Sequence, residues 1–217
     1  MAKLQDIIQW CDQTLKSTEF KDYAPNGLQI EGKTEVRKIL AAVTASQDAI
    51  DAAIRENADL LLVHHGYFWK GEAYPITGMR GKRIKSLIQH DISLLAYHLP
   101  LDSHPSLGNN AAIADLLKLE RIEALDPSER HPIGNIGYLK QPMPVEEFKT
   151  FVSETLKFDV THLPADKNMI EKVGFCTGGA QDFIVKAAEQ GCDAYISGEV
   201  SERTFYEAKE LGVHYFA

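Results

Sequence analysis

The order of apolar and polar positions predicts strands that alternate with helices along the whole chain. Residues 58–63 hold five apolar side chains in six positions and lie between turn-forming residues, the pattern of a buried strand. Residues 3–16 instead place apolar side chains at the spacing of one helix face. The same reasoning predicts further strands at 28–30, 38–43, 92–97, 133–139, 158–163, 171–176, 193–197 and 213–216, and helices at 47–57, 82–89, 110–117, 144–156, 180–190 and 201–211.

Two segments of the chain align without gaps when Lys38 is placed on Lys172. Each segment is predicted to be a strand, a turn, a helix and a second strand, so the agreement favours duplication over chance. On this alignment His64 and His65 fall on Gly198 and Glu199. Identical residues coincide at Gln47-Asp48 and Gln181-Asp182, Ile50 and Ile184, Ala53 and Ala187, and Asp59 and Asp193.

The repeat also suggests how the chain divides. Residues 120–131 are polar and irregular, so we predict a first α/β repeat at 1–122 and a second at 123–217. In the first copy, strand 92–97 leads into polar residues and a helix, whereas the matching strand of the second copy ends with Ala217. We therefore expect a further C-terminal segment of about 30 residues by comparison with the first copy.

Composition narrows the class of protein. The chain has 217 residues, a net charge of −8 and 44% hydrophobic residues, as a globular protein does. An acidic surface argues against broad binding of nucleic acid or of anionic membranes. The three cysteines have no CxxC spacing, which indicates reduced thiols. Without a basic-apolar leader or a long apolar run, the cytoplasm is the expected location.

The chemistry is expected where the strand at 58–63 ends in His64 and His65. Carboxyl ends of strands are where open α/β sheets collect their functional groups. Asp102 follows the next predicted strand and could bridge two metal ions held by the histidines. His98 and Asp102 are four residues apart, so in a continuous strand their side chains would lie on the same face. Pro100, however, interrupts the strand between them. The alternative is structural, with the histidines bound to loops and Asp102 capping a turn.

Three other features of the sequence could contribute to a functional site. Glu199 could act as a general base or second carboxylate near the site, or it could cap the helix predicted from Ser201. The aromatic loop at 66–79 could roof a pocket or form a subunit contact. Cys176 precedes a Thr-Gly-Gly turn but has no base nearby in sequence, so a packing role is expected.

Several separated motifs together resemble the NIF-three-like family, whose members are also called GTP cyclohydrolase 1 type 2 homologues. The resemblance covers nearly the whole chain and is closest to the short bacterial type. It rests on Asp-Tyr-Ala-Pro-Asn-Gly-Leu-Gln-Ile-Glu-Gly (22–32), Val-His-His-Gly-Tyr-Phe-Trp-Lys-Gly (63–71), His-Leu-Pro-Leu-Asp-Ser-His-Pro (98–105), Gly-Asn-Asn (108–110), Cys-Thr-Gly-Gly (176–179) and Ser-Gly-Glu-Val-Ser-Glu (197–202).

The resemblance implies a duplicated, intertwined α/β fold of α-β-(βα)n repeats with two mixed sheets. It also implies a homohexamer, a ring of dimers, and two divalent metal ions of the Zn, Fe, Mn or Mg type. His64, His65 and Asp102 match metal ligands of the family. A further His and Glu of the family motif are expected beyond Ala217.

The function that the resemblance implies is metal-dependent hydrolysis of a nucleotide or a similar phosphorylated compound. Paired ions would activate water and polarise the attacked group, and Glu199 or a neighbour would move protons. The alternative is a metal-holding ring without catalytic activity that binds partner proteins.

Overall fold

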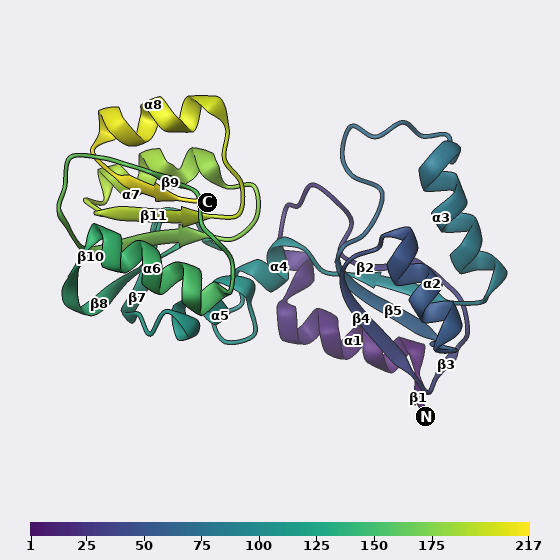
Figure 1. The fold of residues 1–217 in the computed structure, drawn as a ribbon. Coiled ribbons are helices and arrows are strands. Elements are labelled where there is room, and N and C mark those ends of the chain that lie inside the picture. The colour runs from purple at the N-terminus through teal and green to yellow at the C-terminus, as the bar shows by residue number, and fades with distance from the viewer. The chain divides into compact units, whose positions relative to one another are not determined.

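The computed structural model describes residues 1–217, which form two compact units, Met1–Leu101 and Asp102–Ala217 (Figure 1). Each unit holds a sheet of parallel and antiparallel strands with helices packed on both of its faces. The mixed-sheet α/β fold predicted from the sequence is therefore confirmed. No helix combines the length and the apolar character needed to cross a lipid bilayer.

The first unit is built on a four-stranded sheet in the order β2-β6-β5-β4. Strands β4, β5 and β6 run parallel, and β2 is antiparallel to β6. A separate pair of short strands, β1 and β3, is antiparallel. The elements are β1 (Ala2–Lys3), α1 (Leu4–Leu15), a 3₁₀ turn (Ser17–Glu19), β2 (Gly27–Ile30), β3 (Glu35–Val36), β4 (Ile39–Thr44), α2 (Gln47–Arg55), β5 (Leu60–His65), α3 (Gly78–Gln89) and β6 (Ser93–Ala96).

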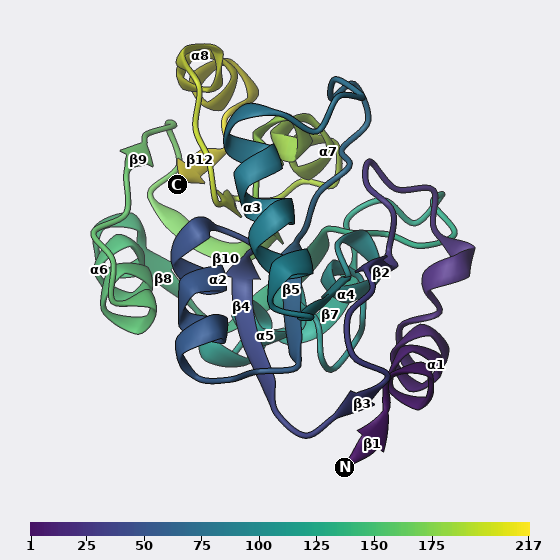
Figure 2. The ribbon, with the colours of Figure 1, turned by 90° about the vertical axis from the view of Figure 1, so that its right-hand side faces the viewer.

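Helices cover both faces of this sheet, which is why its central strands are almost wholly apolar. Helices α2 and α3 pack on one face against Leu61 and Leu94, and Figure 2 looks onto these two helices. Helix α1 packs on the other face, where Leu60 and Leu95 are completely buried. The continuous run 60–63 is therefore apolar on both sides, as a strand buried between two helix layers must be.

The second unit is built on a six-stranded sheet in the order β7-β8-β10-β11-β12-β9, in which β10, β11 and β12 are parallel. Helices α5 and α6 share one core with the sheet, and α7 and α8 share the other. The elements are α4 (Leu99–Asp102), which begins before the unit boundary, α5 (Asn109–Leu116), β7 (Glu120–Ala124), β8 (Asn135–Pro144), α6 (Val145–Leu156), β9 (His162–Leu163), β10 (Met169–Cys176), a 3₁₀ turn (Gln181–Phe183), α7 (Ile184–Glu189), β11 (Ala194–Ser197), α8 (Glu202–Leu211) and β12 (His214–Phe216).

The structure divides the chain earlier than the position 122/123 predicted from the sequence. Ala114 of α5 and Leu117 just after it pack in the core of the second unit, although both residues lie within the predicted first repeat. Residues 120–124 are a strand, β7, at the edge of the sheet, where the sequence predicted an irregular segment. The side chains of an edge strand lie mostly in water, so β7 lacks the apolar pattern that marks the central strands.

The predicted duplication has a counterpart in the contacts of one aspartate in each unit. Asp59 precedes β5, and its Oδ2 accepts hydrogen bonds from the backbone N–H groups of Arg37 at 2.9 Å and Lys38 at 3.3 Å. Its Oδ1 lies 2.9 Å from the Lys33 ammonium. Asp59 thereby ties the start of β4 to the start of β5, and it also binds the lysine of the preceding turn.

Asp193 makes the same contacts in the second unit. Its Oδ2 accepts from the backbone N–H groups of Glu171 at 3.0 Å and Lys172 at 2.9 Å, and its Oδ1 lies 2.7 Å from the Lys167 ammonium. These partners occupy the positions that the sequence alignment pairs with those around Asp59. The two repeats therefore share a specific polar clamp as well as the order of their elements.

Candidate metal centre

Three histidines of the first unit converge at the carboxyl edge of its sheet. His64 and His65 end β5, and His98 follows β6, the parallel neighbour of β5. Their potential ligand atoms all lie within 4.8 Å of one another. The ring centroids of His64 and His65 are 4.4 Å apart, and those of His64 and His98 are 5.1 Å apart. The structure thus brings the two predicted histidines together with His98, whose role the sequence left open.

Each of the three imidazoles is anchored through its Nδ1 atom. The partners are the Tyr97 carbonyl for His64 at 2.9 Å, Thr44 Oγ1 for His65 at 3.1 Å, and Asp22 Oδ1 for His98 at 2.7 Å. A carbonyl oxygen only accepts, so Nδ1 of His64 carries the proton and Nε2 is the nitrogen that can bind a metal. Histidines that ligate metals in proteins are oriented by hydrogen bonds of this kind. The residues present therefore fit a divalent transition-metal ion.

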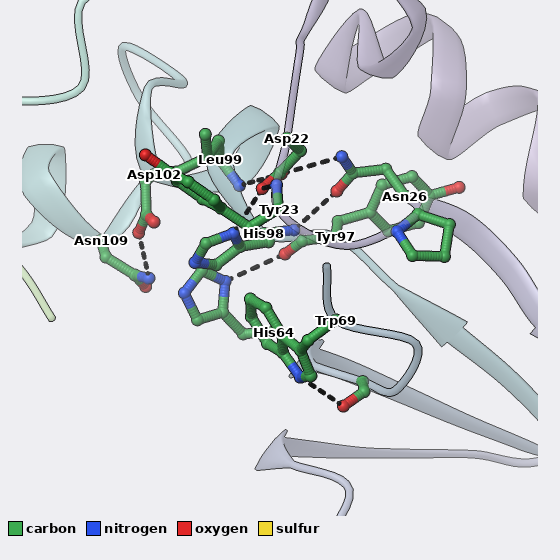
Figure 3. A network of polar contacts seen from close by, with 12 residues as sticks. Asp22, Tyr23, Asn26, His64, Trp69, Tyr97, His98, Leu99, Asp102 and Asn109 are labelled. Carbon is green, nitrogen blue, oxygen red and sulfur yellow. Dashed lines mark hydrogen bonds and ion pairs between the residues drawn. The ribbon is translucent and has the colours of Figure 1, made fainter. Parts of the chain in front are cut away.

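Asp22 is the centre of the polar network beside His98 (Figure 3). Its carboxylate, only 3% exposed, accepts the His98 ring N–H as well as the Asn26 side-chain amide and the Leu99 backbone N–H, the last two at 2.9 Å. Burial alone would raise the pKa of Asp22, but the hydrogen bonds from these three residues outweigh it and lower the pKa. A charged carboxylate on Nδ1 makes the opposite nitrogen of His98 a more basic ligand.

The sequence did not reveal this role of Asp22, because the segment 22–32 is interpreted there only as one of the motifs that carry the family resemblance. The signal that could have revealed it is the four-residue spacing of Asp22 and Asn26, whose side chains bind each other. Asn26 Nδ2 binds Asp22, and Asn26 Oδ1 accepts the backbone N–H of His98 at 2.8 Å. This segment therefore serves to carry a carboxylate across to the end of β6.

We expect Asp22→Asn to lower the affinity of the protein for Zn²⁺ by about 10- to 100-fold, the usual effect of removing a carboxylate that orients a histidine ligand. The amide cannot supply the negative charge that polarises His98. Competition with a fluorescent chelator measures the change. Asp48→Asn, on the exposed first turn of α2, is the control and should leave the affinity unchanged. Equal affinities for Asp22→Asn and the unaltered protein would contradict this role.

The aromatic loop after β5 borders the histidines through Trp69. The Trp69 ring meets His98 edge-on, with centroids 5.0 Å apart, and lies 6.0 Å from His65. Gln29 holds the start of the loop, because its amide accepts the Tyr67 backbone N–H at 2.7 Å and donates to the Tyr67 carbonyl at 3.1 Å. Gly66 has to be glycine here, since a Cβ atom would lie 2.6 Å from the Cβ of Ala96 and 2.2 Å from the Gln29 side-chain oxygen. Trp69 is thus held as one wall of the candidate centre.

Asp102 and Glu199, the two predicted carboxylates, belong to the second unit. Asp102 ends α4 and is 6% exposed, and its Oδ1 accepts hydrogen bonds from Asn109 Nδ2 at 2.8 Å and Thr177 Oγ1 at 3.4 Å. Figure 3 shows the bond to Asn109. These contacts fix the orientation of the carboxylate, and its role as a metal ligand stays a prediction.

Glu199 is exposed, and its backbone carbonyl accepts the hydroxyl of Tyr215. The N-cap of α8 is Ser201, which forms a capping box with Thr204. Glu199 therefore does not cap this helix, the structural alternative considered for it. Its role in moving protons stays a prediction.

Cys176 has the packing role expected from the sequence. It is 2% exposed and lies in the core that β11 and β12 share with α7 and α8. Burial raises the pKa of its thiol to about 12, with a smaller contribution from Asp102. A thiol in this state is almost entirely protonated at neutral pH and is a poor nucleophile.

Fold and centre together define an α/β protein of duplicated repeats that carries a histidine site suited to a metal ion. Residues 2–217 match the family described as Duf34/NIF3 (NGG1p interacting factor 3), and the chain belongs to this family. The resemblance seen in the sequence motifs is thereby confirmed.

Similar proteins include two that are called GTP cyclohydrolase 1 type 2 homolog. The protein of Haemophilus influenzae is 50% identical over 214 residues, which are 98% of this chain and 84% of that protein. The protein of Escherichia coli K12 is 44% identical over 216 residues, 99% of this chain and 85% of that protein. A solved structure titled "Structural genomics, protein ybgI, unknown function" has a TM-score of 0.94 and 43% identity to this chain. The match covers 100% of this chain and 86% of the chain in that structure.

Proposed function

We propose that this protein is a metal-dependent hydrolase that acts on a nucleotide or a similar phosphorylated compound and uses two divalent metal ions. The observation that carries the proposal is the convergence of His64, His65 and His98 within 4.8 Å, each anchored through Nδ1. The name of the relatives, GTP cyclohydrolase 1 type 2 homolog, supplies the substrate class.

The chemistry of the donor set supports a transition metal. Imidazole nitrogens suit Zn²⁺ and Fe²⁺, and to a lesser degree Mn²⁺, whereas Mg²⁺ prefers oxygen ligands. His64, His65 and His98 would hold the first ion. Asp102 is the carboxylate that the family resemblance adds to this set, and a carboxylate can bridge to a second ion.

A bound divalent ion would act as a Lewis acid that polarises the group under attack and favours deprotonation of water. The protein's own residues supply orientation. Asp22 fixes the His98 ring, the Tyr97 carbonyl fixes His64, and Trp69 covers one side of the rings. Glu199 is the proposed proton carrier.

A second candidate function is a metal-holding scaffold without catalytic activity, in the form of a homohexameric ring of dimers that binds partner proteins. The family description, NGG1p interacting factor 3, favours this alternative. It needs the same histidines but no substrate.

One experiment separates the two functions. We expect elemental analysis of the purified protein to find a transition metal, and metal-loaded protein to hydrolyse one member of a panel of nucleotides and generic phosphoesters. His65→Ala should abolish turnover and leave the oligomer intact. The control His90→Ala, at an exposed histidine, should preserve both turnover and the oligomer. Bound metal without turnover on any compound of the panel would overturn the hydrolase and favour the scaffold.

A further inference from the structure

A second pair of histidines joins two strands of the second unit. His162 lies on β9, the outermost strand of the sheet, and His214 lies on its antiparallel neighbour β12. Nε2 of His162 and Nδ1 of His214 are 3.0 Å apart, a hydrogen-bond distance. His214 is 2% exposed, so its hydrogen bonds to protein groups are not shared with bulk water.

The surrounding groups determine which nitrogen of each ring carries a proton. The backbone N–H of Ala165 donates to Nδ1 of His214 at 3.2 Å, so this nitrogen is an acceptor. Nε2 of His214 lies 2.8 Å from the Lys167 carbonyl and must donate to it. His214 is therefore neutral, and His162 is the donor in the bond between the rings. The hydrogen bond between the two rings, with His162 as its donor, therefore requires that Nδ1 of His214 carries no proton.

Charge on His162 is disfavoured where it lies. Burial lowers its pKa, and neighbouring His214 adds to this effect. On helix α6, Glu146 favours the charged ring and Lys149 opposes it. The ammonium of Lys167 is held by Asp193 at 2.7 Å, and the group of Lys167 that contacts the pair is its backbone carbonyl.

The pair occupies one face of the two strands. The His162 ring stacks on Phe216, with centroids 4.6 Å apart and planes 2° from parallel, on the face that α6 covers. Leu163 and Tyr215 belong to the core that α8 covers on the other face. The charged side chains of α8 are therefore on the opposite side of the strands from the two imidazoles.

We propose that His162 and His214 form a pH-sensitive latch that holds the edge strand β9 against β12 and releases it when the pair takes up protons. A proton on Nδ1 of His214 would face the backbone N–H group of Ala165, so that hydrogen bond would be lost, and the bond between the rings would persist only with His162 in its other tautomer. A proton added to His162 would place a charge in a site that burial and its neighbour make unfavourable.

The direction of the effect follows from where the protons bind. The pKa of His162 is lower in the closed strand pair than in water, so the released state binds more protons as the pH falls. The latch is closed above the ordinary histidine pKa of about 6.5, and it weakens progressively below that pH.

Release of β9 would affect an apolar cavity of about 230 Å³ in the same unit. Val160, just before β9, and Ala217, just after β12, both line this cavity. Thr161 and Ala217 exchange two backbone hydrogen bonds, of 3.1 and 2.9 Å, across the seam between the strands. β9 has no strand on its other side, so nothing else in the sheet retains it. Opening of the latch would therefore remove part of the wall of this cavity.

Nuclear magnetic resonance of the ¹⁵N-labelled 217-residue chain tests the latch without any substitution. At about pH 7.5 we expect a ¹⁵N–¹⁵N coupling across the hydrogen bond between the two rings, and at about pH 5.5 its loss. The amide protection factors of Thr161 and Ala217 should fall about tenfold over the same range, because a released imidazole with the ordinary pKa of about 6.5 takes up a proton between these two pH values. Amides between β10 and β11 should keep their protection, which shows that the opening is local.

Two variants complete the test. His162→Gln keeps an N–H donor for His214 but removes one titrating ring, and it should reduce the pH effect on protection to about threefold or less. His90→Gln, at an exposed histidine just after α3, should show the full effect. Absence of the coupling at both pH values, constant protection in the unaltered chain, or an unchanged pH effect in His162→Gln would each overturn the proposal.

Discussion

Replacement of His98 by alanine is expected to lower the affinity of the protein for Zn²⁺ by about 100- to 1,000-fold. Zinc sites of proteins are worth roughly 10–16 kcal/mol, so one ligand in four contributes about 2.5–4 kcal/mol. The side chain is one of three whose ligand atoms lie within 4.8 Å, and it is fixed by Asp22 at 2.7 Å. Competition against a fluorescent chelator measures the affinity.

The comparison with other histidines makes this prediction specific. His64→Ala should weaken binding to a similar extent, and His90→Ala, at an exposed position, should not weaken it. If His98→Ala kept full affinity while His64→Ala lost it, His98 would not be a ligand. It would then serve only to link Asp22 to the end of β6.

The second large effect is expected at the polar clamps of the two repeats. Asp59→Ala should lower the free energy of unfolding by about 3 kcal/mol, and Asp193→Ala by about 2 kcal/mol. Each substitution leaves two backbone N–H groups and a lysine without their acceptor. The side chain of Asp59 is 10% exposed and that of Asp193 is 22% exposed, so water can replace the lost bonds more easily at Asp193. Urea denaturation measures both values.

The pH dependence of these variants has a defined sign. The bond from Lys33 and the N–H groups of Arg37 and Lys38 lower the pKa of Asp59 despite its burial. Stability from such a carboxylate is complete above its unfolded pKa of about 4 and is lost as the pH falls through its lower folded value. The difference between Asp59→Ala and the unaltered protein should therefore shrink in acid. Asp115→Ala, at an exposed position of α5, is the control. A stability loss confined to one of the two clamps would contradict their equivalence.

The two repeats keep the clamp but differ at the strand ends where chemistry is expected. In the first unit β5 ends in His64 and His65. The aligned positions of the second unit are Gly198 and Glu199. Gly198 lies so close to the preceding turn that a Cβ atom would be 2.9 Å from the Gly178 carbonyl oxygen. Duplication therefore explains the shared architecture, and the histidine centre is a property of the first copy alone.

Local sequence predicted the central strands and most helices because burial between two helix layers requires unbroken apolar runs. The run before His64 and the helix faces of α1 and α2 are examples. The same reasoning failed for β7, whose exposed side chains resemble those of a loop. It also placed the boundary between the units too late, since the packing of α5 depends on partners distant in sequence.

The alternation of strands and helices, the duplication, and the position of His64 and His65 at the end of a buried strand can all be predicted from the amino-acid sequence. These features depend on residue spacing and on the apolar character of short segments. That His98 joins these two histidines, and that Asp22 orients His98, is seen only in the folded chain. The physical reason is that parallel strands bring their ends to one edge, and a hydrogen bond between residues 22 and 98 leaves no periodic signal in the chain.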